Sequence, residues 1–401
     1  MKIGMVTHEY PPNIRGGCGI SCELLVRNLR KKGIYVDVFV FDIERSTIYS
    51  EMGNTYYFEI ASNLPHILNL TTLLKLKIPK KRYDLIHVYG VTQISVLKIL
   101  KMFHHTPIVA TLNGFEEACF DYSTWMSRKC KTCTVIENYH CIYNMNNKLN
   151  RPKILVPFKF LYFNIQRYFS KRIDDYIALS DSIKEIYISA GFPEDKITVI
   201  PNMIDPNFIQ LVNNSKTKKY SESNGRNVVL YIGNLNKTKG VDTLINSFSK
   251  ISKNNVELWI VGTGIHEKQF KDIADKSPMR ENIKFFGFVE YKKLPDFYKA
   301  ADVFVHPGIW PEPFGRTILE AMICKLPVIT SNVGAPPKIV DDSGLIYEVG
   351  DLDALTQRLE QILSDKEKRA KLANSLFEKA KSKYGIDSIV NEIIKVYEKN
   401  M

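Results

Sequence analysis

Short apolar runs alternate with amphipathic stretches along most of the chain. Residues 2–7 predict a first strand, and residues 15–33 predict a glycine turn that leads into an amphipathic helix. Further strands are predicted at 35–41, 84–90, 107–114, 175–180 and 197–202. Strands separated by helices pair in parallel, so this half predicts a doubly wound sheet.

The alternation restarts after the polar stretch NNSKTKKYSESNG at 213–225, which is typical of an interdomain loop. The second set of strands is predicted at 227–234, 256–264, 283–289, 301–308 and 326–332. A chain of 401 residues is too long for one ordinary core. We therefore predict an α/β chain with two Rossmann-like, doubly wound parallel-sheet domains, 1–205 and 206–384. Residues 385–401 predict a terminal helix that could pack back on the N-terminal domain.

Two parallel sheets side by side would face a central cleft, and ligands bind outside the carboxyl ends of such strands. Glycines follow many of the predicted strands, where they allow a backbone to approach a ligand closely. They are Gly16, Gly17, Gly19, Gly90, Gly114, Gly233, Gly262, Gly264 and Gly308. For any one of them a simple turn is the favoured explanation, but their repeated placement favours a cleft.

The amino-acid composition indicates the broad class of protein. Hydrophobic residues make up 45% of the chain and charged residues 24%, as in soluble globular proteins. The first residues, MKIGMVTHEYPP, form a strand pattern and lack the basic end and longer apolar core of a signal peptide. We therefore expect a cytoplasmic protein, which could lie at the inner face of the membrane.

The net charge of +12 is concentrated in two basic stretches, 73–82 and 151–172, and neither contains an acidic residue. The second stretch interleaves its basic residues with Phe, Tyr and Leu, a combination that suits contact with an anionic membrane. The alternative is two solvated faces over a core. Nucleic acid is not expected as a partner, because no recognised binding motif accompanies the charge.

The chain contains seven cysteines, which should mostly be reduced in a cytosolic protein. Cys130 and Cys133 have the Cys-x-x-Cys spacing of zinc ligands, and Cys119 and Cys141 flank them. These four thiolates could hold a zinc ion that fixes a loop. The outer two are irregularly spaced, so free thiols are the alternative that we favour.

The stretch IWPEPFGRTILEAM, residues 309–322, places Glu312 on a proline-rich loop and Glu320 just inside the helix that follows. The amides at the start of that helix, from Gly315 to Ile318, should lack intrahelical partners and favour an anion such as a diphosphate. Two carboxylates beside a diphosphate would repel it unless they accept hydrogen bonds from neutral hydroxyls. We interpret Glu320 as a ligand of ribose hydroxyls and Glu312 as a ligand of a sugar. The alternative is a solvated Glu320 and a capping Glu312.

This segment resembles the E-x7-E signature of family 4 glycosyltransferases, which are retaining enzymes with the GT-B fold. The resemblance covers nearly the whole chain, because the glycine loop at 11–39 and the motifs DLIHVYG, VIPNMID, YIGNLNKTKG, LWIVGTG, ADVFVHPG and GLIYEVGD follow in family order. It implies that Glu320 holds ribose, that Glu312 holds the donor sugar, and that Lys239 pairs with the diphosphate. It also implies that the backbone around Phe314, Gly315, Arg316 and Thr317 holds sugar and phosphate, that Gly16 and Gly17 close over the diphosphate, and that no metal or other cofactor is required.

Four positions depart from the family pattern. Asn234 stands where arginine is usual, which removes a charge from the phosphate site that Arg316 could replace. Asn113 stands where histidine is expected near the sugar; it can donate a hydrogen bond but cannot carry a proton. Lys325 stands at a usual glycine, so it must adopt left-handed geometry at a cost of about 1 kcal/mol or change the helix end. Lys338 stands where glutamate is common.

The resemblance implies transfer of a hexose from a UDP- or GDP-linked sugar to a glycan or lipid-linked acceptor hydroxyl, in polysaccharide or glycolipid synthesis. His87, at a predicted strand end, is the acceptor-side candidate, although a lone histidine there is explained equally well by a structural role. Asn113 and Asn234 keep open a different class of function, a catalytically weak protein that binds a nucleotide-sugar or a partner enzyme. A sugar-nucleotide epimerase of the same fold is a further alternative.

Overall fold

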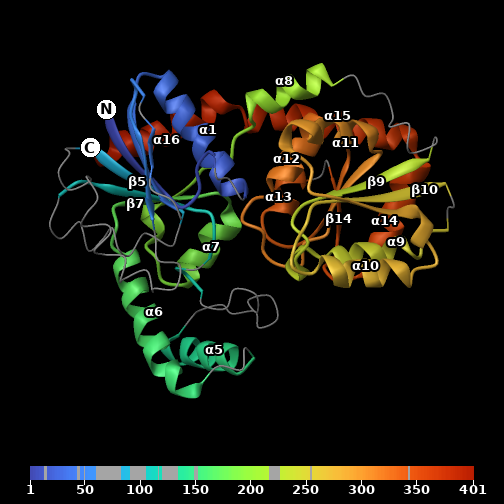
Figure 1. Cartoon of the computed structure of the whole chain (residues 1–401), viewed down its shortest axis with the longest axis horizontal. Helices are drawn as coiled ribbons and strands as arrows, with labels where there is room; N and C mark the ends of the chain where they lie inside the picture. Colours follow the sequence, from blue (N-terminus) through green and yellow to red (C-terminus); the bar gives the residue numbers. More distant parts are fainter. Residues whose placement is uncertain are drawn as a thin grey trace. The chain divides into compact units, whose positions relative to one another are not determined.

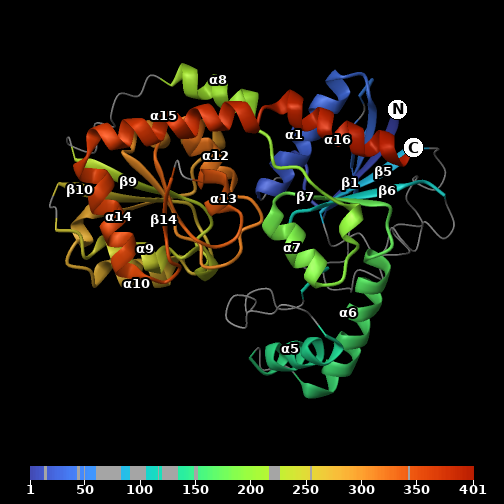
Figure 2. The same cartoon turned by 180° about the vertical axis from the view of Figure 1, so that it is seen from behind.

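The computed structural model describes residues 1–12, 16–42, 46–48, 50–59, 83–90, 105–115, 117–119, 134–148, 152–215, 226–252, 255–341 and 344–401. The chain forms two units (Figures 1 and 2). Unit 1 comprises Met1–Asn202 and Asp387–Met401, and unit 2 comprises Met203–Ile386. The units change between Asn202 and Met203, close to the predicted boundary at 205/206 and before the polar stretch 213–225 that is typical of an interdomain loop.

The helix that follows the unit boundary explains this difference. Helix α8 (Pro206–Asn214) carries Phe208, whose ring packs against Tyr291 and Tyr298 at centroid distances of 5.3 and 6.0 Å. This apolar contact fixes α8 to unit 2. The polar stretch thus begins inside unit 2, and its residues 216–225 lie outside the described part of the chain.

Unit 1 contains an eight-stranded sheet, among the described residues, in the order β3-β4-β2-β1-β5-β6-β7-β8. Its strands are β1 (Lys2–Thr7), β2 (Tyr35–Asp42), β3 (Ser46–Ile48), β4 (Thr55–Glu59), β5 (Leu85–Tyr89), β6 (Ile108–Leu112), β7 (Asp175–Ala178) and β8 (Ile197–Val199). All neighbours pair in parallel except β3, which pairs antiparallel with β4 at the sheet edge. The central strands β5 and β6 are buried along their whole length, as expected when both faces of a sheet are covered.

The described helices of unit 1 are α1 (Gly17–Lys31), α5 (Val135–Lys148), α6 (Val156–Ser170), α7 (Asp181–Ser189) and α16 (Ile386–Asn400). Helix α16 comes from the far end of the chain and packs on the sheet. Its Lys399 Nζ and Asn400 Nδ2 both donate to the Asp175 carboxylate, at 3.0 and 2.6 Å. The terminal helix thus returns to the N-terminal unit, the arrangement that sequence analysis had left open.

Unit 2 contains a six-stranded sheet, within the described ranges, in the order β11-β10-β9-β12-β13-β14. Its strands are β9 (Asn227–Ile232), β10 (Val256–Val261), β11 (Ile283–Gly287), β12 (Val303–His306), β13 (Val328–Ser331) and β14 (Leu345–Tyr347), all parallel. The remaining helices are α9 (Val241–Phe248), α10 (Glu267–Asp275), α11 (Leu294–Ala300), α12 (Arg316–Ile323), α13 (Pro336–Val340), α14 (Leu352–Ser364) and α15 (Lys366–Lys383). The strand order reverses between β9 and β12, which is the topological switch point of a Rossmann sheet.

The predicted fold class is therefore confirmed: each unit is a parallel α/β sheet. The short strands β3, β4 and β14 were not predicted. No described helix combines the length and apolarity that crossing a bilayer requires.

Candidate functional site

The candidate site of unit 2 lies where its strand order reverses. The loop after β9 and the loop after β12 meet there, and the Ile309 amide donates to the Thr238 carbonyl at 3.0 Å. The contact requires Gly240, which has φ = 67° and whose added Cβ would lie 2.0 Å from the Pro307 carbonyl oxygen. Only glycine combines this backbone conformation with this approach. The two loops are therefore held in one arrangement.

Glu312 is also held by the chain beyond β13. The Ala335 amide donates to the Glu312 carbonyl at 3.0 Å. Gly334 has φ = 74°, and an added Cβ would lie 2.5 Å from the Glu312 amide nitrogen. The Ser331 hydroxyl donates to the Gly308 carbonyl at 2.6 Å. The backbone of Glu312, the residue predicted to bind the sugar, is thus fixed by neighbours on both sides.

The Glu312 side chain pairs with Lys239, which sequence analysis had placed in the same site. Lys239 Nζ lies 2.5 Å from Glu312 Oε2, and the Trp310 indole N–H donates to the same oxygen at 2.7 Å. Lys239 Nζ also lies 5.1 Å from the centre of the Trp310 ring, a cation–π geometry. The short 3-10 helix η8 (Lys237–Lys239) places the Lys239 ammonium group beside the loop that carries Glu312.

The ionisation of this cluster is set by burial and by the ion pair. Burial alone would raise the pKa of Glu312, but Lys239, His306 and the hydrogen bond from Trp310 together hold it below its ordinary value. Burial lowers the pKa of His306 to about 4, and Glu312 offsets only part of that effect. At neutral pH the cluster therefore contains an ionised Glu312 and a neutral His306.

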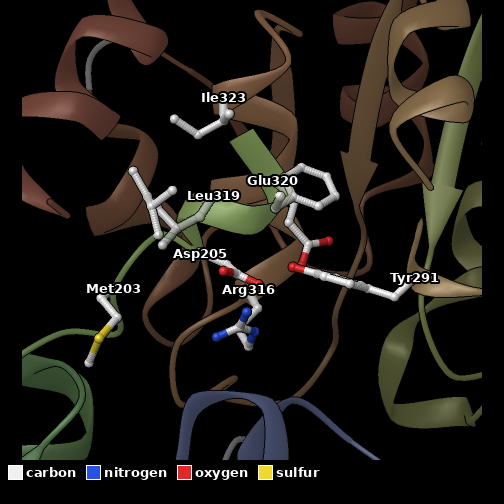
Figure 3. Close-up of a pocket in the computed structure, with 9 residues that line it drawn as sticks. Met203, Asp205, Tyr291, Arg316, Leu319, Glu320 and Ile323 are labelled. Atoms are coloured by element: carbon white, nitrogen blue, oxygen red, sulfur yellow. The ribbon is translucent and has the colours of Figure 1, made fainter. Parts of the chain in front are cut away.

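Glu320 lies on the buried side of α12, with 8% of its surface exposed. The Tyr298 hydroxyl donates to Glu320 Oε2 at 2.9 Å. In Figure 3 the Tyr291 hydroxyl points at the Glu320 carboxylate, with the Arg316 guanidinium beside them. Glu320 is therefore a buried, partnered carboxylate, and the alternative of a solvated helix residue does not hold.

A small pocket, partly open to solvent, lies against Glu320. Its polar lining comes from Asp205, Tyr291, Arg316 and Glu320, and its apolar lining from Met203, Ile204, Phe208, Leu319 and Ile323 (Figure 3). Burial raises the pKa of Glu320, and Arg316 and the tyrosine hydroxyls offset only part of that shift. The pKa values of the two glutamates of the E-x7-E segment thus move in opposite directions.

The other donor-side predictions fall around the start of α12. Gly315 is the N-cap with φ = 105°, and the Ile318 amide donates to the Gly315 carbonyl at 3.0 Å. Ile318 is therefore engaged in the first turn and does not belong to the predicted set of amides without intrahelical partners. The Phe314 side chain is buried, with its ring 5.8 Å from that of Tyr384, and Thr317 presents its carbonyl to the Tyr298 hydroxyl at 3.3 Å.

Two further predicted residues are Arg316 and Asn234. Arg316 lies beside Glu320 in the pocket. Asn234 has an exposed side chain, and its carbonyl accepts the Tyr231 hydroxyl at 2.9 Å.

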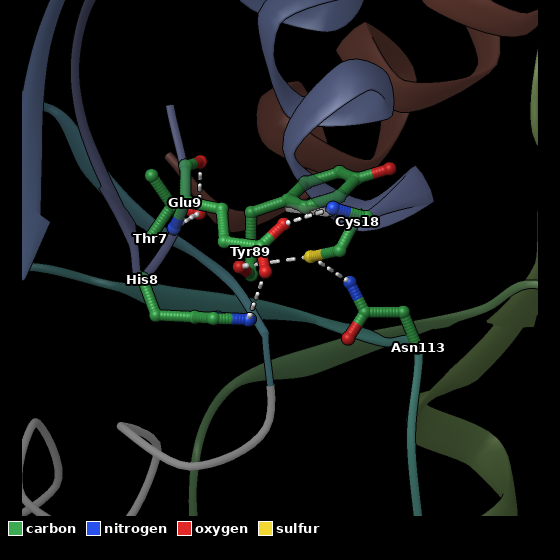
Figure 4. A network of polar contacts seen from close by, with 7 residues as sticks. Thr7, His8, Glu9, Cys18, Tyr89 and Asn113 are labelled. Carbon is green, nitrogen blue, oxygen red and sulfur yellow. Dashed lines mark hydrogen bonds and ion pairs between the residues drawn. The ribbon is translucent and has the colours of Figure 1, made fainter. Parts of the chain in front are cut away.

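Unit 1 has its own polar cluster at the switch point between β1 and β5 (Figure 4). Gly16, the N-cap of α1, donates its amide to Glu9 Oε2 at 3.0 Å, and Gly17 is the first helical residue. His8 Nε2 lies 3.9 Å from Glu9 Oε1. Asn113 Nδ2 lies 2.9 Å from Cys18 Sγ, which places the predicted sugar-side asparagine next to this cluster.

His87 lies in the core of unit 1 and is fully buried. Its Nδ1 is 2.6 Å from the Tyr397 hydroxyl of α16, and its Nε2 is 2.8 Å from the Thr111 hydroxyl. Burial lowers the pKa of His87 to about 3. This is the environment of a structural histidine, and it argues against the acceptor-side role predicted from the sequence.

Only two of the four cysteines of the predicted zinc site lie among the described residues. Cys130 and Cys133 lie outside the described residues, whereas Cys119 and Cys141 lie within them. In the described ranges no group of three or more His, Cys, Asp or Glu side chains is arranged to hold a metal ion. The basic stretch 73–82 likewise lies outside the described residues.

Sequence reasoning missed the groups that surround the glutamates. His306 ends β12 and Trp310 lies in the following loop with Glu312, so their proximity in the sequence was a usable signal. Tyr298 and Tyr291 reach Glu320 only through packing of α11 and the preceding turn. In unit 1, His8 and Glu9 directly follow β1, and their place at a strand end could have drawn attention to them.

Two protein-family models match the chain. The model described as Glycosyltransferase Family 4 matches residues 15–208, and the model described as Glycosyl transferases group 1 matches residues 212–378. An uncharacterized glycosyltransferase of Methanocaldococcus jannaschii is 29% identical over 99% of this chain and 98% of its own length. The capsular polysaccharide biosynthesis glycosyltransferase CapM of Staphylococcus aureus is 32% identical over 56% of this chain and 61% of its own length.

Solved structures show the same fold. HepE of Anabaena, crystallised with UDP and glucose, superposes with a TM-score of 0.74 at 19% identity and full coverage of both chains. Sucrose-phosphate synthase of Thermosynechococcus elongatus gives a TM-score of 0.76 at 19% identity, covering 99% of this chain and 98% of its own. With each unit matched by a glycosyltransferase model, the chain belongs to the family 4 glycosyltransferases of the GT-B fold.

Proposed function

We propose that the chain is a retaining glycosyltransferase that moves a hexose from a nucleoside-diphosphate sugar to a hydroxyl of a glycan or lipid-linked acceptor. The observation that carries the proposal is the arrangement in unit 2 of Glu312, Lys239 and Glu320 around one loop–helix turn at the switch point. The turn combines two fixed carboxylates with a cation and the positive end of a helix.

Each group has a role in this proposal. Glu320 accepts the ribose hydroxyls, and Lys239 and the first amides of α12 hold the diphosphate. Lys239 and Trp310 both donate to Oε2 of Glu312, so Oε1 can accept a hydroxyl of the donor sugar. Groups fixed before the substrate arrives stabilise developing charge without reorganisation.

The reaction is a substitution at the anomeric carbon. The bond from that carbon to the leaving phosphate oxygen breaks, the bond to the acceptor oxygen forms on the same face, and the acceptor proton goes to the leaving diphosphate. Neither Glu312 nor Glu320 is required as a nucleophile. No metal ion is needed in this scheme, because Lys239 and the helix amides offset the phosphate charge.

The names of related proteins support a UDP-linked hexose donor and a role in envelope polysaccharide synthesis. HepE was crystallised with UDP-glucose, CapM is a capsular polysaccharide glycosyltransferase, and O-antigen chain mannosyltransferase B of Escherichia coli is 32% identical over 140 residues. A lipid-linked acceptor would bring the enzyme to an anionic membrane surface, which the basic and aromatic stretch 151–172 suits.

Release of nucleoside diphosphate with and without acceptor tests the proposal, with retention read from the anomeric configuration of the product by NMR. Acceptor-dependent release is expected. Binding without release would indicate a nucleotide-sugar-binding protein, and conversion of the donor sugar without an acceptor would indicate an epimerase.

The site assignment is tested by Glu320→Gln. Loss of a charged acceptor should weaken binding of UDP or GDP by roughly 1.5–3 kcal/mol in calorimetry. Glu378→Gln, an exposed change on α15 of the same unit, is the control and should bind as the unmodified protein does. Equal affinities for all three proteins would remove Glu320 from the site.

A further inference from the structure

Helices α5 and α6, with the 3-10 helix η5 (Lys153–Leu155) before α6, form a helical hairpin in unit 1. The hairpin has its own small core, in which Ile142, Val156 and Phe163 are buried against one another. In Figures 1 and 2, α6 runs away from the sheet of unit 1, and α5 lies beside its distant end. The hairpin is therefore a projecting part of unit 1.

The near end of α6 is firmly attached to unit 1. Ser170 Oγ donates to Glu117 Oε2 at 2.6 Å, and Arg167 donates to the Ala190 carbonyl at 2.5 Å. The hydroxyl of the buried Tyr176 donates to the Ser170 carbonyl. These contacts fix the direction of α6, so the position of its outer face is set by the fold.

Helix α6 has two apolar stripes at helical spacing. One contains Val156, Phe160 and Phe163 and packs inside the hairpin. The other contains Phe158, Leu161, Ile165 and Tyr168, whose exposed fractions are 69, 59, 37 and 53%. A helix needs only one apolar stripe to pack on its protein. The second stripe contributes nothing to the core of unit 1.

Further exposed apolar side chains lie on α5 and η5 of the same hairpin. We define the hairpin surface by its nine exposed large apolar residues: Val135, Ile136, Tyr139, Ile154, Leu155, Phe158, Leu161, Ile165 and Tyr168. The described residues contain 15 exposed large apolar side chains, so this one hairpin holds more than half of them. Single exposed apolar residues are ordinary, whereas their concentration in one hairpin, four of them in one stripe of α6, favours a contact surface.

The charge around this surface selects the partner. From 135 to 172 the sequence contains seven Lys and Arg residues and a single acidic residue, Glu137. Arg172 stacks on the exposed Tyr168 ring, with its guanidinium carbon 3.3 Å from the ring centre. An apolar surface with aromatic side chains and a strong basic excess complements the acyl boundary and negative headgroups of an anionic bilayer.

We propose that the hairpin surface docks unit 1 onto an anionic lipid bilayer, with Phe158 and Leu161 inserted at the headgroup boundary. This inference extends the membrane contact in the proposed function by naming the surface that makes it. Helix α6 has 15 residues, which is too short to cross the hydrocarbon layer, so it lies in the interface.

Sedimentation of the full chain with vesicles tests the proposal. The vesicles contain phosphatidylcholine alone or with about 30% phosphatidylglycerol, in about 50 mM or about 500 mM NaCl. The unmodified protein should sediment with the anionic vesicles, less so at high salt and much less with neutral vesicles. The double variant Phe158→Ser and Leu161→Ser should show at least about a tenfold lower partition coefficient at both salt concentrations, because it loses the apolar part of the contact.

A matched control carries Ile265→Ser and Phe288→Ser in unit 2, whose side chains are more exposed, at 84 and 77%, but lie outside the hairpin surface. It should sediment as the unmodified protein does. Circular dichroism and thermal melting of the hairpin variant should be unchanged, because both of its substitutions are at exposed positions. A second readout uses Phe158→Trp, whose added fluorescence should be quenched by brominated lipid.

Two results would overturn the inference. One is that the unmodified protein stays in the supernatant with anionic vesicles at low salt; the other is that the hairpin variant sediments as well as the unmodified protein. A concentration-dependent dimer that the hairpin variant abolishes, without vesicle binding, would assign the surface to a second copy of the chain. Acceptor-dependent release of nucleoside diphosphate is measured separately, so failure of docking and failure of the proposed function give different results.

Discussion

Lys239 and Glu312 form an ion pair in which only 22 and 16% of the respective side chains are exposed. In such a pair each charge compensates the desolvation of the other, so removal of one partner leaves the second uncompensated. The indole N–H of Trp310 shares the same carboxylate oxygen and fixes its position. At the scale of single residues, the candidate site is thus a set of groups that depend on one another.

Lys239→Ala should weaken binding of a nucleoside diphosphate much more than binding of the bare nucleoside. The loss of a charged hydrogen bond to phosphate should cost roughly 1.5–3 kcal/mol for UDP or GDP, with little change for uridine or guanosine. Calorimetric titrations measure both. Lys237→Ala, an exposed change on the same 3-10 helix, is the control. Equal losses for nucleotide and nucleoside would mean that Lys239 only supports the loop.

His87 makes a prediction about stability and pH. Its pKa falls from 6.5 to about 3 on burial, so below pH 6.5 the unfolded chain takes up a proton that the folded chain does not. The contribution of the neutral His87 to the free energy of unfolding is therefore fully present above that pH. It declines as the pH falls toward the pKa of the folded state, by up to about 1.4 kcal/mol per pH unit.

The measurement is the free energy of unfolding in urea, taken as a function of pH between about pH 6.5 and about pH 5. His87→Asn should reduce the slope of this dependence by the contribution of one proton. The exposed His105→Asn is the control and should keep the slope of the unmodified protein. An unchanged slope in His87→Asn would show that this histidine does not resist protonation in the fold.

Helix α12 carries Glu320 and has an uncommon C-terminus. Lys325 adopts φ = 53°, so of the two alternatives for this usual glycine position the chain takes the left-handed geometry. The Leu326 amide donates to the Ala321 carbonyl at 3.0 Å, and the Lys325 amide donates to the Met322 carbonyl at 3.1 Å. Lys325 Nζ lies 4.7 Å from the Phe377 ring centre, a contact that offsets part of the backbone strain. At the scale of elements, the helix that presents Glu320 ends in a strained residue.

Replacement of Lys325 by glycine and by alanine separates these two effects. Both variants lose the contact with Phe377, but only glycine relieves the left-handed strain. Lys325→Gly should therefore be more stable than Lys325→Ala by about 1 kcal/mol, measured by denaturant unfolding. If alanine is as stable as glycine, the backbone at this helix end is not strained.

At the scale of the molecule, both units place polar residues where their strand order reverses. In unit 2 these are Lys239 and Glu312, after β9 and β12. In unit 1 they are His8 and Glu9, after β1. The carboxyl ends of strands on either side of a switch point diverge and leave room for a ligand. The same architectural rule thus locates the candidate residues in each unit separately.

Transfer activity of the whole chain should survive EDTA, because in the proposed mechanism Lys239 and the first amides of α12 offset the phosphate charge. The measurement is the rate of nucleoside diphosphate release before and after chelation. Elemental analysis of the protein for zinc is the control for a structural thiolate site. Inactivation that divalent ions reverse, in a protein free of bound zinc, would contradict the proposed mechanism.

The sequence by itself determined the two α/β units, the positions of most strands, and the loop–helix segment that carries Glu312 and Glu320. These features follow from local patterns: apolar runs predict strands, and proline and glycine predict where the chain turns. It also identified Lys239 and the strained Lys325, because family resemblance assigns roles to positions.

Only the tertiary structure decided which distant side chains meet. Lys239 and Glu312 are 73 residues apart, and His87 and Tyr397 are 310 residues apart. The second contact placed His87 in the core and returned α16 to unit 1. The sequence pattern of α6 shows two apolar stripes, but packing decided which of them is buried. Local periodicity depends on residues that are close in the sequence, whereas burial depends on contacts between distant segments that meet only on folding.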